Sequence, residues 1–221
     1  MYTRGRILFV LLIGSLAMGK VMFKEEFDED WESRWIKSSW KADAQGEFVR
    51  TKGKWYGDEE MAYGLQTSTD MKPYVLSTKF PEPLERNKKP FVIQYSIKFE
   101  KPIECGGGYI KLVEKDFDPK TFGGETPLVV MFGPDICGGN NVIQLILDYN
   151  GTGRLWKKKP IAPADGLTHI YTLDLHPDDT YAVYLDAEPL ENGTWSEDWD
   201  ISVPKLIPDP NDKKPEVLIN G

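Results

Sequence analysis

Short apolar segments, several of them alternating with polar residues, run along most of the chain. The clearest alternation covers residues 91–99. Successive side chains of a strand point to opposite faces, so this segment predicts a strand with one apolar face. The residues on that face are Phe91, Ile93, Tyr95, Ile97 and Phe99. Other short apolar segments predict strands over residues 74–80, 108–112, 128–132, 142–149, 169–175 and 181–185.

Turn-forming residues separate these segments and indicate where strands end. Asn150-Gly151 and Asn192-Gly193 are dipeptides typical of tight turns, and Pro177-Asp178-Asp179 is a third turn signal. Helical periodicity is convincing only near the N-terminus. Several short strands with polar outer faces predict an all-β fold, an antiparallel β-sandwich.

Residues 1–19 have the pattern of a secretory signal peptide. Two arginines precede the apolar residues 7–18, and Ala17-Met18-Gly19 resembles a cleavage site. The apolar stretch has 12 residues, whereas a helix that spans a bilayer needs about 20. We therefore predict a mature chain that begins near residue 20 and has no transmembrane anchor.

The composition changes near residue 203. Prolines then stand among aspartate, asparagine and lysine residues, at Pro204, Pro208, Pro210 and Pro215. Such a composition is typical of an extended segment and does not supply a packed core. We predict a β-sandwich domain over residues 20–203 and the start of a Pro-rich arm over residues 204–221.

The formal net charge of the chain is −8. A protein that binds nucleic acid needs a basic surface to neutralise phosphates, and none is evident in the sequence. The only basic run is Lys157-Lys158-Lys159, which we interpret as a solvated turn between strands. We therefore expect no nucleic-acid partner.

Cys105 and Cys137 are the only cysteines. The oxidising compartment implied by a signal peptide favours a disulfide between them. Two buried free thiols are the alternative. A zinc site is not predicted, because the two histidines, His169 and His176, are distant in the sequence.

Several motifs resemble those of the calreticulin/calnexin family. The two most specific contain the cysteines: CGGGYIKL at residues 105–112 and MFGPDICG at residues 131–138. Further motifs are FKEEF at 23–27, YGDEE at 56–60, GLQTS at 64–68, THIYTL at 168–173 and EDWD at 197–200. The resemblance covers about residues 21–217. The triple glycine and YGDEE are more similar to the soluble branch of the family than to the membrane-anchored one.

The resemblance implies a legume-lectin-like (concanavalin-like) β-sandwich with a Pro-rich arm inserted late in the chain. Residues 207–216 are similar to the first repeat of that arm, so we expect the sandwich to be incomplete at its C-terminus. The implied protein is a lectin chaperone without enzymatic activity. It would bind monoglucosylated N-glycans, nascent glycoproteins and unfolded polypeptides. The implied location is the endoplasmic reticulum lumen, or outside the cell, since no retrieval signal is present.

Two residues of the CGGGYIKL motif have the chemistry of a sugar site. Tyr109 and Lys111 are two positions apart and therefore face one side of a strand. Lys111 can donate hydrogen bonds to sugar hydroxyls and Asp135 can accept them. From spacing alone, a surface salt bridge beside a half-buried tyrosine is the alternative. The resemblance favours the sugar site, because these positions match glucose-binding residues of the family.

The resemblance also extends this site. Met131 and Ile146 match the family's apolar platform, and Gly124 matches a backbone contact. Leu128 is a departure, since it stands where the family usually has a second binding tyrosine and it lacks the hydroxyl. Gln144 stands where animal members often have histidine. A further acidic sugar ligand of the family lies beyond this sequence, so the groove is expected to be incomplete.

Calcium, Ca2+, is a further ligand that the resemblance implies. The high-affinity site of the family uses backbone carbonyl groups, here near Glu26, Met61 and Tyr63, and an aspartate beyond this sequence. Oxygen ligands of this kind suit a hard cation. We expect this site to be incomplete and the abundant carboxylates to bind calcium weakly.

Two alternatives to an intact lectin remain open. Asp28, Asp30 and Glu32 have the period of two that would place carboxylates on one strand face, as a glycoside hydrolase on a similar sandwich requires. They lie in a charged segment that we interpret as a loop. The other alternative is a truncated, non-lectin or decoy form with residual polypeptide binding and an unpaired sheet edge.

Some further residues are assigned structural or modification roles. Asn150-Gly151-Thr152 and Asn192-Gly193-Thr194 are N-glycosylation sequons that are also typical of turns. His169 lies in an apolar strand and is interpreted as a core histidine with satisfied hydrogen bonds. The tryptophans near the start of the mature chain are interpreted as packing residues: Trp31, Trp35 and Trp40.

Overall fold

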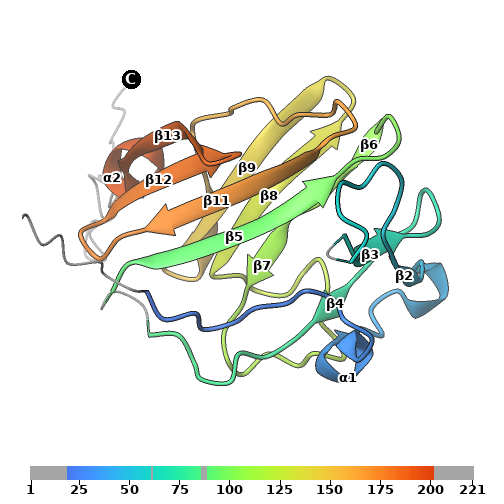
Figure 1. Cartoon of the computed structure of the whole chain (residues 1–221). Coiled ribbons are helices and arrows are strands. Elements are labelled where there is room, and N and C mark those ends of the chain that lie inside the picture. Colours follow the sequence, from blue (N-terminus) through green and yellow to red (C-terminus); the bar gives the residue numbers. More distant parts are fainter. Residues whose placement is uncertain (1–18, 61, 86–88, 202–221) are drawn as a thin grey trace, which may run out of the picture.

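The fold consists of two antiparallel β-sheets stacked face to face, with α1 and the short strands β2, β3 and β4 gathered at one side and helix α2 beside β13 (Figure 1). The computed structural model describes residues 19–60, 62–85 and 89–201. Three earlier predictions therefore fall outside the described residues: the signal peptide apart from Gly19, the Pro-rich arm, and the contribution of Met61 to a calcium site.

One sheet has five strands within the described ranges. They are β6 (Cys105–Gly107), β7 (Ile110–Leu112), β8 (Val130–Cys137), β9 (Asn140–Tyr149) and β10 (Thr152–Leu155). The order is β10-β9-β8, and both β6 and β7 pair with the other side of β8. Their register along β8 is continuous, from Cys105 opposite Cys137 to Leu112 opposite Val130. They therefore act as one strand with a short interruption.

The strand is interrupted at Gly108 and Tyr109 because a side chain of the facing sheet binds the backbone there. The hydroxyl group of Tyr95 reaches across the sandwich and donates to the carbonyl oxygen of Gly108 at 2.7 Å. Gly133 lies on β8 at this level with φ +142°. A β-carbon added there would lie 1.9 Å from the Tyr95 hydroxyl oxygen, so only glycine fits. The hydrogen bond from Tyr95 to Gly108 therefore fixes the backbone next to Tyr109.

The other sheet has four strands within the described ranges. They are β5 (Phe91–Lys98), β11 (Thr168–Leu175), β12 (Thr180–Leu185) and β13 (Glu188–Thr194). The order is β13-β12-β11-β5, all antiparallel. Asp186 and Ala187 form a two-residue turn between β12 and β13, and Asn150 and Gly151 form one between β9 and β10. Both residues of each turn have positive φ angles.

The hydrophobic core lies between the two sheets. β8 and β9 contribute Phe132 and Leu145, and the four-stranded sheet contributes Tyr171 and Leu173, all at most 1% exposed. Tyr95 packs against Phe132 across the interface with ring centroids 6.3 Å apart. Burial of these side chains is the main favourable term for folding, at about 25 cal/mol for each Å² of apolar surface removed from water.

Smaller elements border the sandwich. They are α1 (Trp31–Arg34), β1 (Ile36–Lys37), the 3-10 helix η1 (Ala42–Ala44), β2 (Phe48–Thr51), β3 (Gly64–Thr67), β4 (Leu76–Ser77) and α2 (Trp195–Asp198). Glu25 anchors the segment before α1, because its carboxylate accepts hydrogen bonds from Arg34, from the Trp35 indole and from the Phe27 amide. Its side chain is 6% exposed. The hydrogen bond from Arg34, with those from Trp35 and Phe27, lowers the pKa of Glu25 to about 2.

The structure confirms the all-β fold and the apolar face of residues 91–99, which packs into the core. The turns at Asn150-Gly151 and Pro177-Asp178-Asp179 are also confirmed. The turn expected at Asn192-Gly193 is wrong, because both residues lie in β13 and pair with β12. Lys158 is only partly solvated, since its ammonium group binds Glu191 at 3.1 Å and Asp198 at 3.4 Å.

Candidate functional site

The outer face of the five-stranded sheet gathers most of the predicted sugar-binding residues. Backbone pairing places Lys111 opposite Met131, Met131 opposite Ile146, and Ile146 opposite Leu155. Residues paired side by side in neighbouring strands present their side chains on the same face of a sheet. These four residues therefore form a row across β7, β8, β9 and β10, with a cation at one end and apolar side chains along the rest.

A second row crosses the same face four residues further along β8. Gly107 pairs with Asp135, and Asp135 pairs with Val142. Tyr109 lies between the two rows, two residues from both Gly107 and Lys111, and its side chain is 44% exposed. A β-carbon added at Gly107 would lie 2.9 Å from the Tyr109 ring, so the ring covers this glycine. Burial raises the pKa of the Tyr109 hydroxyl, and the charge of Asp135 adds to this effect.

Lys111 is held at the edge of this surface. Its ammonium group donates to the carbonyl oxygen of Gly124 at 3.3 Å and lies 6.0 Å from the centre of the Tyr109 ring. Burial lowers the pKa of Lys111, while the nearby carboxylate of Glu125 acts in the opposite direction. The structure thus brings Tyr109, Lys111 and Gly124 together around one cation.

Leu128 lies two residues before the start of β8. The next residue, Val129, donates its amide to the carbonyl of Leu112 at 2.7 Å, and Val129 in turn accepts from the amide of Asp148 at 2.9 Å. The backbone at Leu128 is therefore tied to the strand that carries Lys111. The half-buried leucine side chain offers no hydrogen bond to a sugar.

Two residues on or near this surface were not predicted from the sequence. Leu155 extends the apolar row beyond Ile146 and is 60% exposed. It lies in a four-residue edge strand whose sequence, TGRL, carries no strand signal. Trp40 packs against Gly123 and lies close to Gly124, and only the tertiary structure brings these distant segments together.

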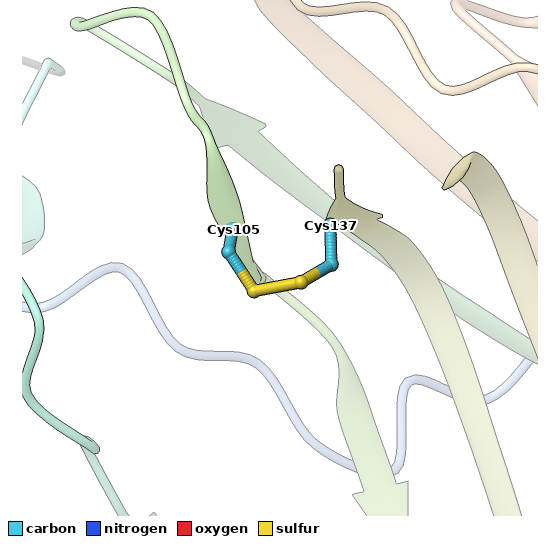
Figure 2. Close-up of a disulfide and its surroundings, with 2 residues drawn as sticks. All are labelled: Cys105 and Cys137. Atoms are coloured by element: carbon cyan, nitrogen blue, oxygen red, sulfur yellow. A yellow bond between two sulfur atoms is a disulfide. The ribbon is translucent and has the colours of Figure 1, made fainter. Parts of the chain in front are cut away.

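A disulfide joins the two strands at one end of the site. Cys105 of β6 and Cys137 of β8 are paired directly across the strands, with Cα atoms 3.9 Å apart (Figure 2). The structure therefore agrees with the expected disulfide and not with two free thiols. Asp135 lies two residues from Cys137, and Tyr109 four residues from Cys105, so the crosslink fastens both segments that carry polar site residues.

A cation of the protein, Arg50, lies beside the described part of the predicted calcium site. The Arg50 guanidinium donates to the carbonyl of Phe27 at 2.6 Å, next to Glu26, and lies 3.6 Å from the centre of the Tyr63 ring. Glu26 itself is exposed and pairs with Lys24 at 2.9 Å. Among the described residues no cluster of three acidic, histidine or cysteine side chains could hold a metal ion.

The three carboxylates considered for hydrolysis do not share a strand face. Glu32 lies in helix α1, directly after Asp30 and Trp31, so the expected period of two does not apply. Asp28 is bound by Arg34 at 2.8 Å. The segment is a loop followed by one helical turn.

His169 lies at the start of β11 and is held by two carboxylates. One ring nitrogen is 2.7 Å from Asp186 and the other 3.0 Å from Asp165. Burial acts to lower the pKa of His169, but the hydrogen bonds with Asp165 and Asp186 outweigh it and raise the pKa. The hydrogen bonds of this histidine are satisfied, as expected, although its partners are exposed carboxylates.

Comparisons with known proteins agree with this architecture. The model of the calreticulin family matches residues 23–218. Curated calreticulins of Euglena gracilis, Caenorhabditis elegans and Chlamydomonas reinhardtii are each 45% identical, over 93%, 95% and 90% of this chain. The chain spans about half the length of these relatives, 51%, 53% and 49%. The solved globular domain of T. cruzi calreticulin is 40% identical with a TM-score of 0.79, covering 89% of this chain and 74% of that one.

The two stacked sheets define a legume-lectin-like β-sandwich. With a family match over most of its length, the chain belongs to the calreticulin family. A search of the described residues finds no helix long and apolar enough to cross a membrane.

Proposed function

We propose that the outer face of the five-stranded sheet binds monoglucosylated N-glycans, and that the chain is a lectin chaperone for nascent glycoproteins without catalytic turnover. The observation that carries this proposal is the register of the sheet. It places Lys111, Met131 and Ile146 in one row, with Tyr109 and Asp135 on the same face. A sugar ring has polar hydroxyl edges and an apolar face, and this surface offers partners for both.

The polar groups of the face have complementary roles toward hydroxyls. An ammonium group has three donors, and the Lys111 ammonium uses one of them on the Gly124 carbonyl. The others can bind two neighbouring sugar hydroxyls, while Asp135 accepts hydrogen bonds from further ones. Ile146, half-buried, and Met131, 7% exposed, lie beside Lys111 in this row and are the proposed apolar platform. Hydrogen bonds to charged groups are shorter and stronger than those between neutral groups.

The test is binding of a monoglucosylated oligomannose glycan, measured by isothermal titration calorimetry. Lys111→Ala and Asp135→Ala should each weaken binding roughly 10- to 150-fold, because each removes a charged hydrogen-bond partner worth about 1.5–3 kcal/mol. Lys72→Ala is the matched control, since Lys72 is an exposed lysine in the segment between β3 and β4. Unchanged affinity in both site variants would contradict the proposal.

Binding of unfolded polypeptides is a second proposed activity. Val92 of β5 and Ile170 of β11 are 54% and 41% exposed. β5 pairs with β11 alone among the described strands, so no described strand occupies its other edge, where an extended chain could pair. Exposed apolar side chains beside an open strand edge are features that attract unfolded segments.

We propose the lumen of the endoplasmic reticulum as the place of action, on the strength of family membership and the predicted signal peptide. Calcium binding is proposed only as weak association with surface carboxylates, since the net charge is −8.

A further inference from the structure

Trp40 lies against the loop that presents the Gly124 carbonyl. A β-carbon added at Gly123 would be 2.4 Å from Cγ of Trp40, and one added at Gly124 would be 3.4 Å from its Cζ2. The first distance is too short for a β-carbon to fit, and the second is an ordinary van der Waals contact. The indole ring therefore occupies the space beside Gly123, which a larger residue there would contest, and it lies close to Gly124.

The backbone around Trp40 is fastened to the same loop. The buried hydroxyl of Ser38 lies 2.5 Å from the carbonyl oxygen of Phe122 and accepts a hydrogen bond from the Trp40 amide at 3.0 Å. The amide of Ser39 donates to the carbonyl of Lys120 at 2.6 Å. The loop between β7 and β8 is thus held by the segment before η1, far away in the sequence.

The other side of the loop meets the sugar site. Gly123 and Thr126 close a turn, because the Gly123 amide donates to the Thr126 hydroxyl at 2.9 Å and the Thr126 amide donates to the Gly123 carbonyl at 3.3 Å. The next carbonyl, that of Gly124, accepts from Lys111. A continuous set of contacts therefore runs from the indole of Trp40 through two glycines to the ammonium group of Lys111.

We propose that Trp40 is a positioning residue of the glycan site, which fixes the Gly124 carbonyl and through it the Lys111 ammonium. This inference rests on the proposed glycan binding. Trp40 lies outside the hydrophobic core formed by the described residues, so its loss should affect the loop more than the sandwich. The ammonium of Lys41 lies 4.5 Å from the centre of the indole and helps hold it in place.

The contact between Trp40 and Gly123 allows a double-mutant cycle. Trp40→Ala should weaken binding of the monoglucosylated glycan roughly 3- to 10-fold, a coupling of the size found between residues in contact. Gly123→Ala should do the same, because its new methyl group displaces the indole. In the Trp40→Ala background the methyl group has room, so adding Gly123→Ala should change affinity less than about 2-fold. Trp40→Phe keeps an aromatic ring on the glycines and should restore most of the affinity.

The controls separate positioning from folding. Trp55→Ala removes a tryptophan that is 90% exposed, and Gly139→Ala adds a methyl group that meets no atom within 4 Å. Both should bind like the unchanged chain. The melting temperature of each variant is measured beside its affinity, and the side-chain NMR resonances of Lys111 should shift in Trp40→Ala but not in Trp55→Ala.

The outcomes distinguish this inference from the proposed function. If Lys111→Ala loses binding while Trp40→Ala and Gly123→Ala bind normally, Trp40 has no positioning role. A fall in melting temperature with unchanged affinity and unchanged Lys111 resonances would also overturn it. If the unchanged chain binds no glycan, the proposed function is wrong, and the Lys111 resonances alone decide whether Trp40 positions the ammonium group.

Discussion

Removal of the disulfide should loosen one end of the sugar site while the other end stays in place. Cys105→Ala with Cys137→Ala removes the only covalent link between β6 and β8. β6 has three residues, Cys105–Gly107, and pairs with β8 alone among the described strands. Two backbone hydrogen bonds flank the disulfide, from Gly108 to Pro134 at 3.1 Å and from Gly138 to Glu104 at 3.0 Å. These bonds should open first.

The expected loss of stability follows from the length of the closed loop. The two cysteines are 32 positions apart, and a crosslink over such a loop stabilises a protein by about 3.5–4 kcal/mol in the chain-entropy model. This is a large part of the roughly 5–15 kcal/mol by which domains are stable. The alanine variant should therefore unfold at a clearly lower urea concentration.

Urea unfolding and amide hydrogen exchange test the two parts of this prediction. The free energy of unfolding should fall by about 3.5–4 kcal/mol, and exchange should accelerate at Gly108 and Gly138. The amide of Val129, bonded to Leu112 at the far end of β7, is the internal control. An unchanged unfolding midpoint, or faster exchange at Val129 equal to that at Gly108, would refute the reasoning.

Two further changes test the groove and the N-terminal anchor. Leu128→Tyr should strengthen glycan binding about 2- to 10-fold, the value of one added neutral hydrogen bond; weaker binding in calorimetry would show that the groove is mapped onto the wrong residues. Glu25→Gln should lower the free energy of unfolding near neutral pH by roughly 2–3 kcal/mol, because Arg34 and other donors lower the pKa of Glu25 from 4.5 to about 2. A lowered pKa stabilises the folded state above pH 4.5, and this contribution is lost as the pH falls toward 2. The difference between Glu25→Gln and the unchanged chain in urea unfolding should therefore shrink over that range, and a constant difference would contradict the assignment.

The strands that could be predicted are those whose sequence carries a period of two or a long apolar run. Residues 91–99 show the apolar face plainly, and β5 has that face in the core. β13 was missed because Pro189 and Asn192-Gly193 are turn formers in isolation. They become a strand by pairing with β12, and a register shift between Val183 and Tyr184 accommodates them. Pairing with a neighbour outweighs local strand preference in such a segment.

Short helices and the contacts of the loop before β8 could not be predicted. α1 and α2 have four residues each, too few to show a helical period. Trp40 was interpreted as a packing residue, which describes its type of contact but not its partner. The partner, Gly123, is more than 80 positions away, and no local pattern links the two.

The position of the site residues on one face depends on the turns that set the register. Met131 and Ile146 become neighbours because β8 and β9 are joined by Gly138 and Gly139 alone, with Gly138 at φ +59°. Side chains alternate along a strand, so a shift of β9 by one residue would turn Ile146 toward the core and Leu145 toward the surface. The core position of Leu145, which is 0% exposed, opposes that shift. The apolar residues that face the core and the two-residue turn thus specify the same register, and the outer face that we propose for glycan binding follows from it.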